Sequence, residues 1–221
     1  MKLVRDIKLG DPSPNKQNFI GLKLNLLCCR YWLLDLWDCH DMVFPFWRLY
    51  WNKNEGGELI HQNKVYTMTP NYIYIIPPFT SFSSRFTKNH MYNEGIHVSG
   101  KHLTTNYNEK DYVDKHLFHF FVHFNLGVPF DNVYPGVFKI ELTDYLRDRL
   151  LYLTERLKVE NSDFKLTFNM KLQAFIKESL TNIGPELWKA INIDERVLKV
   201  IRYIEINIDK QTTLSKKFLL N

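Results

Sequence analysis

The spacing of apolar residues changes once along this chain, close to Thr143. From about Phe19 to Leu142, short runs of aromatic and β-branched residues are separated by turn sequences, a pattern typical of β-strands. After Thr143 the apolar residues recur every three to four positions, as they do in amphipathic helices. A chain that places all its strands before its helices is expected to form a β-sandwich or barrel followed by helices.

The first part contains six strong strand candidates. They are YWLLDLW, FWRLYW, KVYTM, YIYIIPP, HLFHFFVHF and VFKIEL, and the turn signals between them include NKNEGG (52–57), TPN (69–71) and VSG (98–100). The segment from Phe86 to Lys115 is polar and weakly patterned. It is expected to be a hairpin excursion or a long loop at the rim of the barrel.

A helical hairpin is predicted after the strands. Its first helix spans Thr143 to Val159 and its second spans Ser162 to Thr181, where Ser162 and Asp163 would cap the start. Each helix has an apolar stripe, which would pack either on the barrel or against a second copy of the chain. The stripes consist of Leu146, Leu150, Leu151, Leu153 and Leu157 in the first helix, and of Leu166, Met170, Leu172, Phe175, Ile176 and Leu180 in the second.

Composition and charge narrow the class of protein. The chain has 221 residues, of which 45% are hydrophobic and 24% charged, and this fits one globular domain or one domain with a small appendage. The net charge of +5 is scattered, whereas a nucleic-acid surface usually has a basic stripe. No signal peptide and no apolar run near the ~20 residues of a membrane span is found. Three cysteines, Cys28, Cys29 and Cys39, suit buried thiols, so a cytoplasmic location is expected.

The last stretch, DERVLKVIRYIEINIDKQTTLS from Asp194 to Ser215, predicts a third helix at about Asp194 to Ile208, then a polar break and a further helix capped by Thr212 or Thr213. It resembles the start of the DNA-binding domain of AraC-type transcriptional regulators. The tail KKFLLN departs from the small residues that this family usually has there, and the sequence ends at Asn221. The resemblance implies that the base-reading part is absent, and that DNA would be bound only through the missing C-terminal domain.

Two further segments resemble the sensor region of the same family. One is FWRLYWNKNEGGELIHQNKVYTMTPNYIYIIPPFTSF, from Phe46 to Phe82, and the other is HLFHFFVHFNLG, from His116 to Gly127. The resemblance implies a cupin-like jelly-roll barrel at 1–142 that binds a small molecule. It also implies a dimerising helical hairpin at 143–190 and a truncated start of the helix-turn-helix domain at 191–221. The expected partner is a second copy of the chain.

An aromatic group with a cation in the strand region suggests a binding site. Aromatic faces can stack on the C–H surfaces of a sugar, while Arg and His supply directed hydrogen bonds. Trp47, Leu49 and Trp51 share one face of their strand, whereas Arg48 and Tyr50 share the other, and the sequence leaves open which face points inward. The alternative is that these aromatics only fill the barrel. The predicted ligand-binding residues are Trp32, Arg48, Tyr50, Tyr74, His119 and His123.

The histidines of the late strand have three possible roles. His119, Phe121 and His123 share a face, and His116 points the other way in a regular strand. They would be hydrogen-bonded core residues, ligand contacts or metal ligands. The metal-binding segments of enzymatic cupins are not matched, since Pro77 to Phe82 has Phe and Ser where a ligand would be needed. No metal, cofactor or catalytic residue is therefore expected.

These observations predict the ligand-sensing and dimerisation region of an AraC-type regulator with a small polar effector, most plausibly a sugar. It would not be an enzyme and would not bind DNA specifically by itself. The alternative is a metal-dependent cupin enzyme that acts on a small sugar or acid, which stoichiometric metal in the purified protein would reveal. A carbohydrate-binding jelly roll without a regulatory role is a third possibility.

Overall fold

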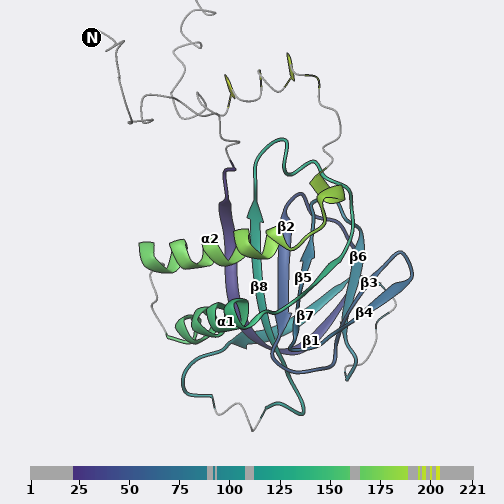
Figure 1. The fold of residues 1–221 in the computed structure, drawn as a ribbon. Coiled ribbons are helices and arrows are strands. Elements are labelled where there is room, and N and C mark those ends of the chain that lie inside the picture. Colours follow the sequence, from purple (N-terminus) through teal and green to yellow (C-terminus); the bar gives the residue numbers. More distant parts are fainter. Residues whose placement is uncertain are drawn as a thin grey trace, which may run out of the picture.

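The computed structural model describes residues 22–88, 92, 94–107, 112–159 and 165–188, with a few single residues between 194 and 204. In this part of the chain all the strands precede the helices, as the sequence predicted (Figure 1). The strands are β1 (Asn25–Met42), β2 (Trp47–Asn52), β3 (Gly57–His61), β4 (Lys64–Met68), β5 (Tyr72–Ile76), β6 (Phe82–Phe86), β7 (Ile96–His102), β8 (Leu117–Asn125) and β9 (Phe138–Glu141). The helices are α1 (Asp144–Leu157), α2 (Leu166–Thr181) and the short 3-10 helix η2 (Pro185–Trp188).

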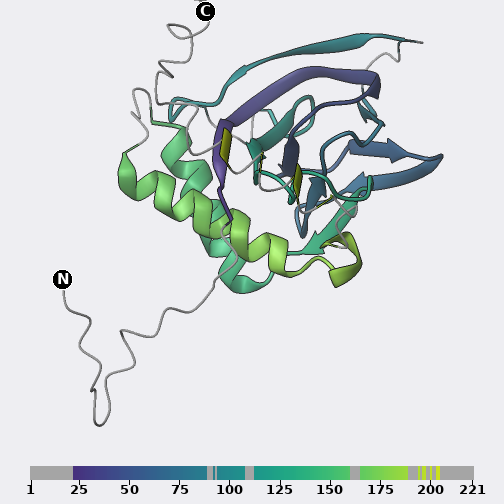
Figure 2. The same cartoon turned by 90° about the horizontal axis from the view of Figure 1, so that it is seen from above.

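The strands form one curled antiparallel sheet, a jelly-roll-like half-barrel (Figure 2). Its order is β4-β3-β6-β1-β8-β2-β5-β9, and β7 pairs with β1 outside this path. The 18-residue β1 connects the parts, because it pairs with β8 along its first half and with β6 at its end. Trp32, Leu33 and Leu34 have partners in both β8 and β7, so β7 lies on the opposite edge of β1.

The two faces of the sheet have different neighbours. On β8, Phe118, Phe120, Val122 and Phe124 face a large apolar core that also contains the buried side chains of both helices. The residues between them, His119, Phe121 and His123, point into the curl of the sheet. This alternation follows from the two-residue period of a strand. It means that β8 separates the helix-covered core from the interior of the barrel.

Both helices cover one face of the sheet (Figure 1). The Oγ1 atom of Thr143 caps α1 by accepting a hydrogen bond from the Leu146 N–H at 3.3 Å. The ring of Phe175 in α2 packs edge-on against Phe120 of β8, with 6.4 Å between the ring centroids. Leu146, Leu150, Leu153 and Leu157 of α1, and Leu172, Phe175, Ile176 and Leu180 of α2, are buried in this core within one chain.

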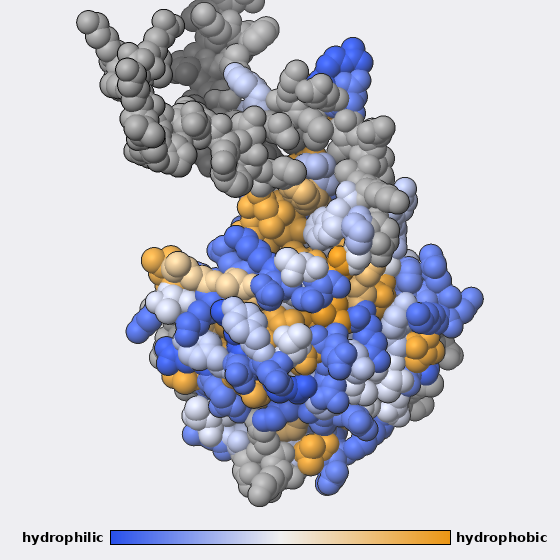
Figure 3. Space-filling view, viewed as in Figure 1, coloured by the Kyte–Doolittle hydropathy of each residue, from blue (hydrophilic) through white to orange (hydrophobic). Residues whose placement is uncertain are grey.

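The burial of these stripes bears on the predicted dimer. The homodimer is predicted on the ground that two apolar stripes offer more surface than one barrel wall covers. In the structure, the sheet and the helices themselves already cover most of both stripes. Leu151, Leu166 and Met170 are the exposed members, with 41%, 75% and 63% of their surface accessible. Figure 3 shows the surface over the helices as mainly hydrophilic with separate apolar spots, and a larger apolar area above α2. The homodimer stays a prediction, without the support of an exposed stripe.

Three local predictions need correction or fall outside the described residues. The segment from Phe86 to Lys115 contains strand β7, and the predicted turn VSG (98–100) lies inside it. A Cβ atom on Gly100 would lie 2.5 Å from the carbonyl oxygen of Leu33, so glycine permits the close approach of β7 to β1. Helix α2 begins at Leu166, and the predicted cap at Ser162 and Asp163 lies outside the described residues. Most of the predicted third helix, Asp194 to Ile208, does so too.

On the face of β2 that packs under the helices, Trp47 contacts the short helix η2. The indole ring of Trp47 stacks on Trp188 of η2 and on Phe124 of β8, with 6.0 Å between ring centroids in each pair. The Nε1–H of Trp47 also donates to the Asp131 carboxylate at 2.8 Å. Asp131 accepts two backbone N–H groups as well, from Leu126 and Gly127. Trp47 therefore connects the barrel with the segment that follows the helices.

Candidate ligand-binding pocket

A cavity of about 270 Å³ lies inside the curl of the sheet. Strands β1, β2, β7 and β8 supply nearly all of its lining, and most of the lining side chains are aromatic or aliphatic. The lining consists of Trp32, Leu34, Trp37, Cys39, Met42, Phe44, Arg48, Tyr50, Ile96, Val98, His119, Phe121 and His123. A concave, mostly apolar cavity with a few converging polar groups is the usual form of a small-molecule site.

Five of the six predicted ligand-binding residues line this cavity, namely Trp32, Arg48, Tyr50, His119 and His123. The inward face of β2 is thus the one with Arg48 and Tyr50, while Trp47, Leu49 and Trp51 belong to the core under the helices. Tyr74 does not line the cavity. Its hydroxyl donates to the carbonyl of Thr67 at 2.8 Å, and burial raises its pKa to about 12.

Arg48 is a buried cation with no carboxylate beside it. Its residue exposure is 8%, and among the described residues it has no acidic partner. Nη1 donates to the Tyr50 hydroxyl at 2.5 Å, and the guanidinium carbon lies 3.4 Å from the centroid of the Phe44 ring. Nε is buried without a hydrogen-bond partner. A guanidinium has five N–H donors, so most of its hydrogen-bonding capacity is left for an occupant of the cavity.

The two cavity histidines are held in the neutral form. Burial, together with the nearby His123 and Arg48, lowers the pKa of His119 to about 3. Burial and Arg48 likewise lower the pKa of His123 to about 3. Arg48 and His123 are directly opposite each other on β2 and β8. Each imidazole therefore offers one donor and one acceptor, and Arg48 is the only cationic side chain of the lining at neutral pH.

The imidazole of His119 is oriented by a residue behind it. Asn52 is fully buried, and its Oδ1 lies 2.7 Å from Nδ1 of His119. The amide nitrogen of Asn52 donates to the sulfur of Met68 at 3.4 Å. A Cβ on Gly57 would lie 2.2 Å from that nitrogen, so the glycine makes room for Asn52.

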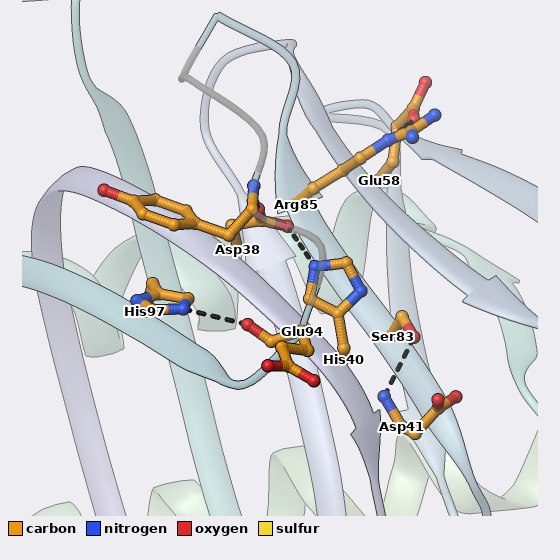
Figure 4. A network of polar contacts seen from close by, with 9 residues as sticks. Asp38, His40, Asp41, Glu58, Ser83, Arg85, Glu94 and His97 are labelled. Carbon is orange, nitrogen blue, oxygen red and sulfur yellow. Dashed lines mark hydrogen bonds and ion pairs between the residues drawn. The ribbon is translucent and has the colours of Figure 1, made fainter.

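Strand β7 forms one wall of the cavity through Ile96 and Val98. Near the start of β7, Tyr92 and His97 take part in contacts with polar groups of β1 (Figure 4). The buried Asp38 carboxylate accepts a hydrogen bond from the backbone N–H of Tyr92 at 2.5 Å and lies 3.2 Å from Nε2 of His40. His97 stacks on the Tyr92 ring, with 3.9 Å between centroids. These contacts hold the start of β7 against β1.

Sequence reasoning missed several lining residues, among them Trp37, Phe44, Cys39 and Val98. Trp37 and Cys39 follow a bulge in β1 between Leu34 and Leu36, which changes the residues that face inward. Val98 was placed in a predicted turn. Phe44 lies between β1 and β2, where no periodicity identifies the inward side. A bulge and a connecting segment leave no sequence signal that would have found these residues.

Other chemistry at the cavity is limited. Burial raises the pKa of the Cys39 thiol above its usual range, although hydrogen bonding to Ser84 opposes this, so Cys39 suits a packing role. Among the described residues, no cluster of three or more His, Cys, Asp or Glu side chains is arranged to hold a metal ion. The helices of the described part are too short or too polar to cross a membrane.

Comparisons with known proteins give only distant similarity. No family model and no curated protein sequence matches the chain. Among solved structures, ToxT from Vibrio cholerae is 9% identical with a TM-score of 0.39, over 89% of this chain and 68% of that one. ToxT from strain O395 is 10% identical with a TM-score of 0.40, over 88% and 67%. ToxT with a bound unsaturated fatty acid is 10% identical with a TM-score of 0.35, over 91% and 69%. At these scores the similarity carries no argument about the ligand of the present chain.

Proposed function

We propose that this chain is the ligand-sensing region of an AraC-type transcriptional regulator, and that its cavity binds a small, largely apolar molecule with one anionic group. The buried Arg48 without a counter-ion is the observation that carries the ligand proposal. The resemblance of the segments Phe46 to Phe82, His116 to Gly127 and Asp194 to Ser215 to AraC-type regulators supports the regulatory role.

The electrostatic argument starts from the cost of an isolated charge. A guanidinium stays protonated at every physiological pH, so Arg48 cannot avoid the cost of burial by losing its proton. Contacts with the rings of Phe44 and Tyr50 offset part of this cost. A carboxylate or similar anion placed against the free N–H groups would form charge-assisted hydrogen bonds and offset much more. Ligand binding would thus satisfy a group that the empty cavity leaves unsatisfied.

The apolar lining of the cavity limits how polar the ligand can be outside its anionic group. A sugar carries hydroxyls around its whole ring, and each one without a partner in the cavity has a desolvation cost. Apart from Arg48, the lining offers few polar groups, namely Tyr50, His119, His123 and the indoles. The cavity volume of about 270 Å³ equals that of roughly nine liquid waters, which suits a molecule of on the order of ten non-hydrogen atoms. The lining thus favours a medium-sized organic acid over the predicted sugar.

The proposed regulatory role takes two features from the family resemblance. The ligand would alter how a C-terminal DNA-binding domain is presented, and the helical hairpin would pair two copies of the chain. Because Trp47 of β2 stacks on Trp188 after the hairpin, a shift of β2 on ligand binding would reach the segment that leads to such a domain. The described chain by itself is not expected to read DNA sequence.

Calorimetry with matched compounds tests the ligand proposal. Octanoate and octanol have the same chain length and differ in charge, and simple mono- and disaccharides test the sugar prediction. We expect octanoate to bind at least tenfold more tightly than octanol, and Arg48→Met to remove this difference. Arg85→Met is the matched control, because Arg85 pairs with Glu58 at 2.6 Å and does not line the cavity.

Two outcomes would count against the proposal. Equal affinity of the wild-type protein for octanoate and octanol would show that Arg48 does not select an anion. Tight binding of a saccharide, with no response to the acids, would favour the sugar predicted from the sequence. A thermal-shift screen reports the same ranking, since a ligand at 100 times its Kd adds about 2.7 kcal/mol to the free energy of unfolding.

A further inference from the structure

The cavity contains a second polar position, around His119. The ring of His119 has two nitrogens, and only Nδ1 has a hydrogen-bond partner among the described residues. That partner is Oδ1 of Asn52, since the amide nitrogen of Asn52 is occupied by the sulfur of Met68. An amide oxygen and a thioether sulfur both only accept hydrogen bonds. Nδ1 of His119 must therefore carry the proton.

This assignment determines what the other ring nitrogen can do. A neutral imidazole has one N–H, so Nε2 of His119 bears a lone pair and acts as an acceptor. The low pKa of His119, about 3, keeps the ring in this neutral form at physiological pH. Because His119 lines the cavity, its free acceptor is available to a donor on the ligand.

The residue opposite His119 on β1 supplies an unsatisfied donor of the protein. Trp32 is directly opposite His119 in the pairing of β1 with β8, and both side chains line the cavity. The Nε1–H of Trp32 is buried and has no hydrogen-bond partner in the described part of the chain. An unpaired buried donor is unfavourable, so a ligand atom that accepts from Trp32 would recover part of that cost.

We infer that the position between His119 and Trp32 binds a hydroxyl group, and that the ligand of this cavity is a small hydroxy acid. A hydroxyl both donates and accepts, so it can donate to Nε2 of His119 and accept from Nε1 of Trp32. A methyl group satisfies neither atom, and an ammonium group cannot accept from Trp32. The inference rests on the proposed function, because it places the acid group at Arg48.

The geometry between the two positions fits a short apolar spacer. The Tyr50 ring centroid lies 5.0 Å from that of His119 and 5.9 Å from the guanidinium carbon of Arg48. The Phe121 ring lies 5.5 Å from His119. A benzene ring or a short alkyl chain placed along these aromatic side chains would leave its acid end at Arg48 and its hydroxyl end at His119.

Calorimetry with two pairs of acids tests this inference. One pair is phenylpropanoate and its para-hydroxy derivative, and the other is octanoate and its omega-hydroxy derivative. We expect at least one hydroxylated acid to bind about tenfold more tightly than its parent, which corresponds to about 1.4 kcal/mol. In His119→Phe this gain should disappear, so that each hydroxylated acid binds no more tightly than its parent. His116→Phe makes the same change at the residue before β8, outside the cavity, and should preserve the gain in affinity.

If His119→Phe does not fold, a measurement on the unliganded wild-type protein still tests the inference. Nitrogen-15 NMR distinguishes the two imidazole tautomers, and we expect His119 to be neutral at pH 6 with its proton on Nδ1. A proton on Nε2 would overturn the inference without affecting the role of Arg48. The inference would also be overturned if the parent acids bind through Arg48 and neither hydroxylated derivative binds more tightly than its parent. If none of the acids binds, the proposed function itself fails.

Discussion

Acidification from pH 7 to pH 5 is expected to destabilise the fold through the two cavity histidines. The pKa of His119 and of His123 is about 3 in the folded protein, whereas a histidine in an unfolded chain titrates near 6.5. Below pH 6.5 the unfolded chain therefore binds protons that the folded chain does not. The stabilising contribution is complete above the unfolded pKa and decreases as the pH falls from 6.5 towards 3.

The magnitude follows from the size of the shift. Each pH unit below 6.5 lowers the free energy of unfolding by about 1.4 kcal/mol for each histidine that stays neutral. Between pH 7 and pH 5 this amounts to on the order of 2 kcal/mol for each residue. The share of His123 is the smaller one, because its side chain is more exposed than that of His119.

Urea denaturation at pH 7, 6 and 5 measures this effect. We expect the wild-type protein to lose about 1–2 kcal/mol more than His123→Gln over this range. Groups other than His123 contribute equally to both proteins and cancel in the difference. His116→Gln reports the effect of removing an imidazole that lies outside the cavity, with its Nε2 2.9 Å from the Asp35 carboxylate. Parallel pH profiles for wild type and His123→Gln would refute the reasoning, because they would show that His123 titrates normally in the fold.

Three further predictions concern Arg48, β7 and the helices. Arg48→Met should raise the unliganded midpoint in urea, because an apolar side chain removes a buried cation that lacks a counter-ion; a lower midpoint would show that Arg48 already stabilises the fold. Gly100→Ala should cost about 1–3 kcal/mol and speed amide exchange in β7, since the added methyl would meet the Leu33 carbonyl at 2.5 Å; unchanged exchange would contradict this. Sedimentation should show a homodimer if Leu151, Leu166 and Met170 form an interface, and a monomer at high micromolar concentration would remove that prediction.

The sequence predicts most of the architecture because the sheet has one face on a helix-covered core. On β8 the alternation of Phe118, Phe120 and Val122 with His119 and Phe121 is a direct consequence of that arrangement. The leucines of α1 follow the helical period for the same reason. Where the environment is less regular, prediction fails. Most residues of β7 are exposed, and only Ile96 and Val98 alternate with polar residues, a pattern too short to distinguish this strand from a loop.

The residues of the candidate site were predicted from the sequence to about the same extent as the architecture. Arg48, Tyr50, His119 and His123 stand out because cations and imidazoles are unusual within strands that are otherwise apolar. Tyr74 belongs to an equally aromatic strand, yet its hydroxyl is directed to the carbonyl of Thr67. Sequence spacing cannot separate these cases, because both tyrosines are inward residues of buried strands. Asn52, the hydrogen-bond partner of His119, and Met68, the partner of Asn52, come from two other strands, and their approach depends on the register of the folded sheet.

The two faces of β2 have a consequence for mutational scanning. Trp47, Leu49 and Trp51 point to the core under the helices, whereas Arg48 and Tyr50 point to the cavity. A saturation library over this strand, scored once for folded protein and once for response to ligand, should therefore give phenotypes with a period of two residues. Substitutions at the odd positions would reduce abundance whether or not ligand is present. Substitutions at positions 48 and 50 would reduce the response to ligand more than they reduce abundance.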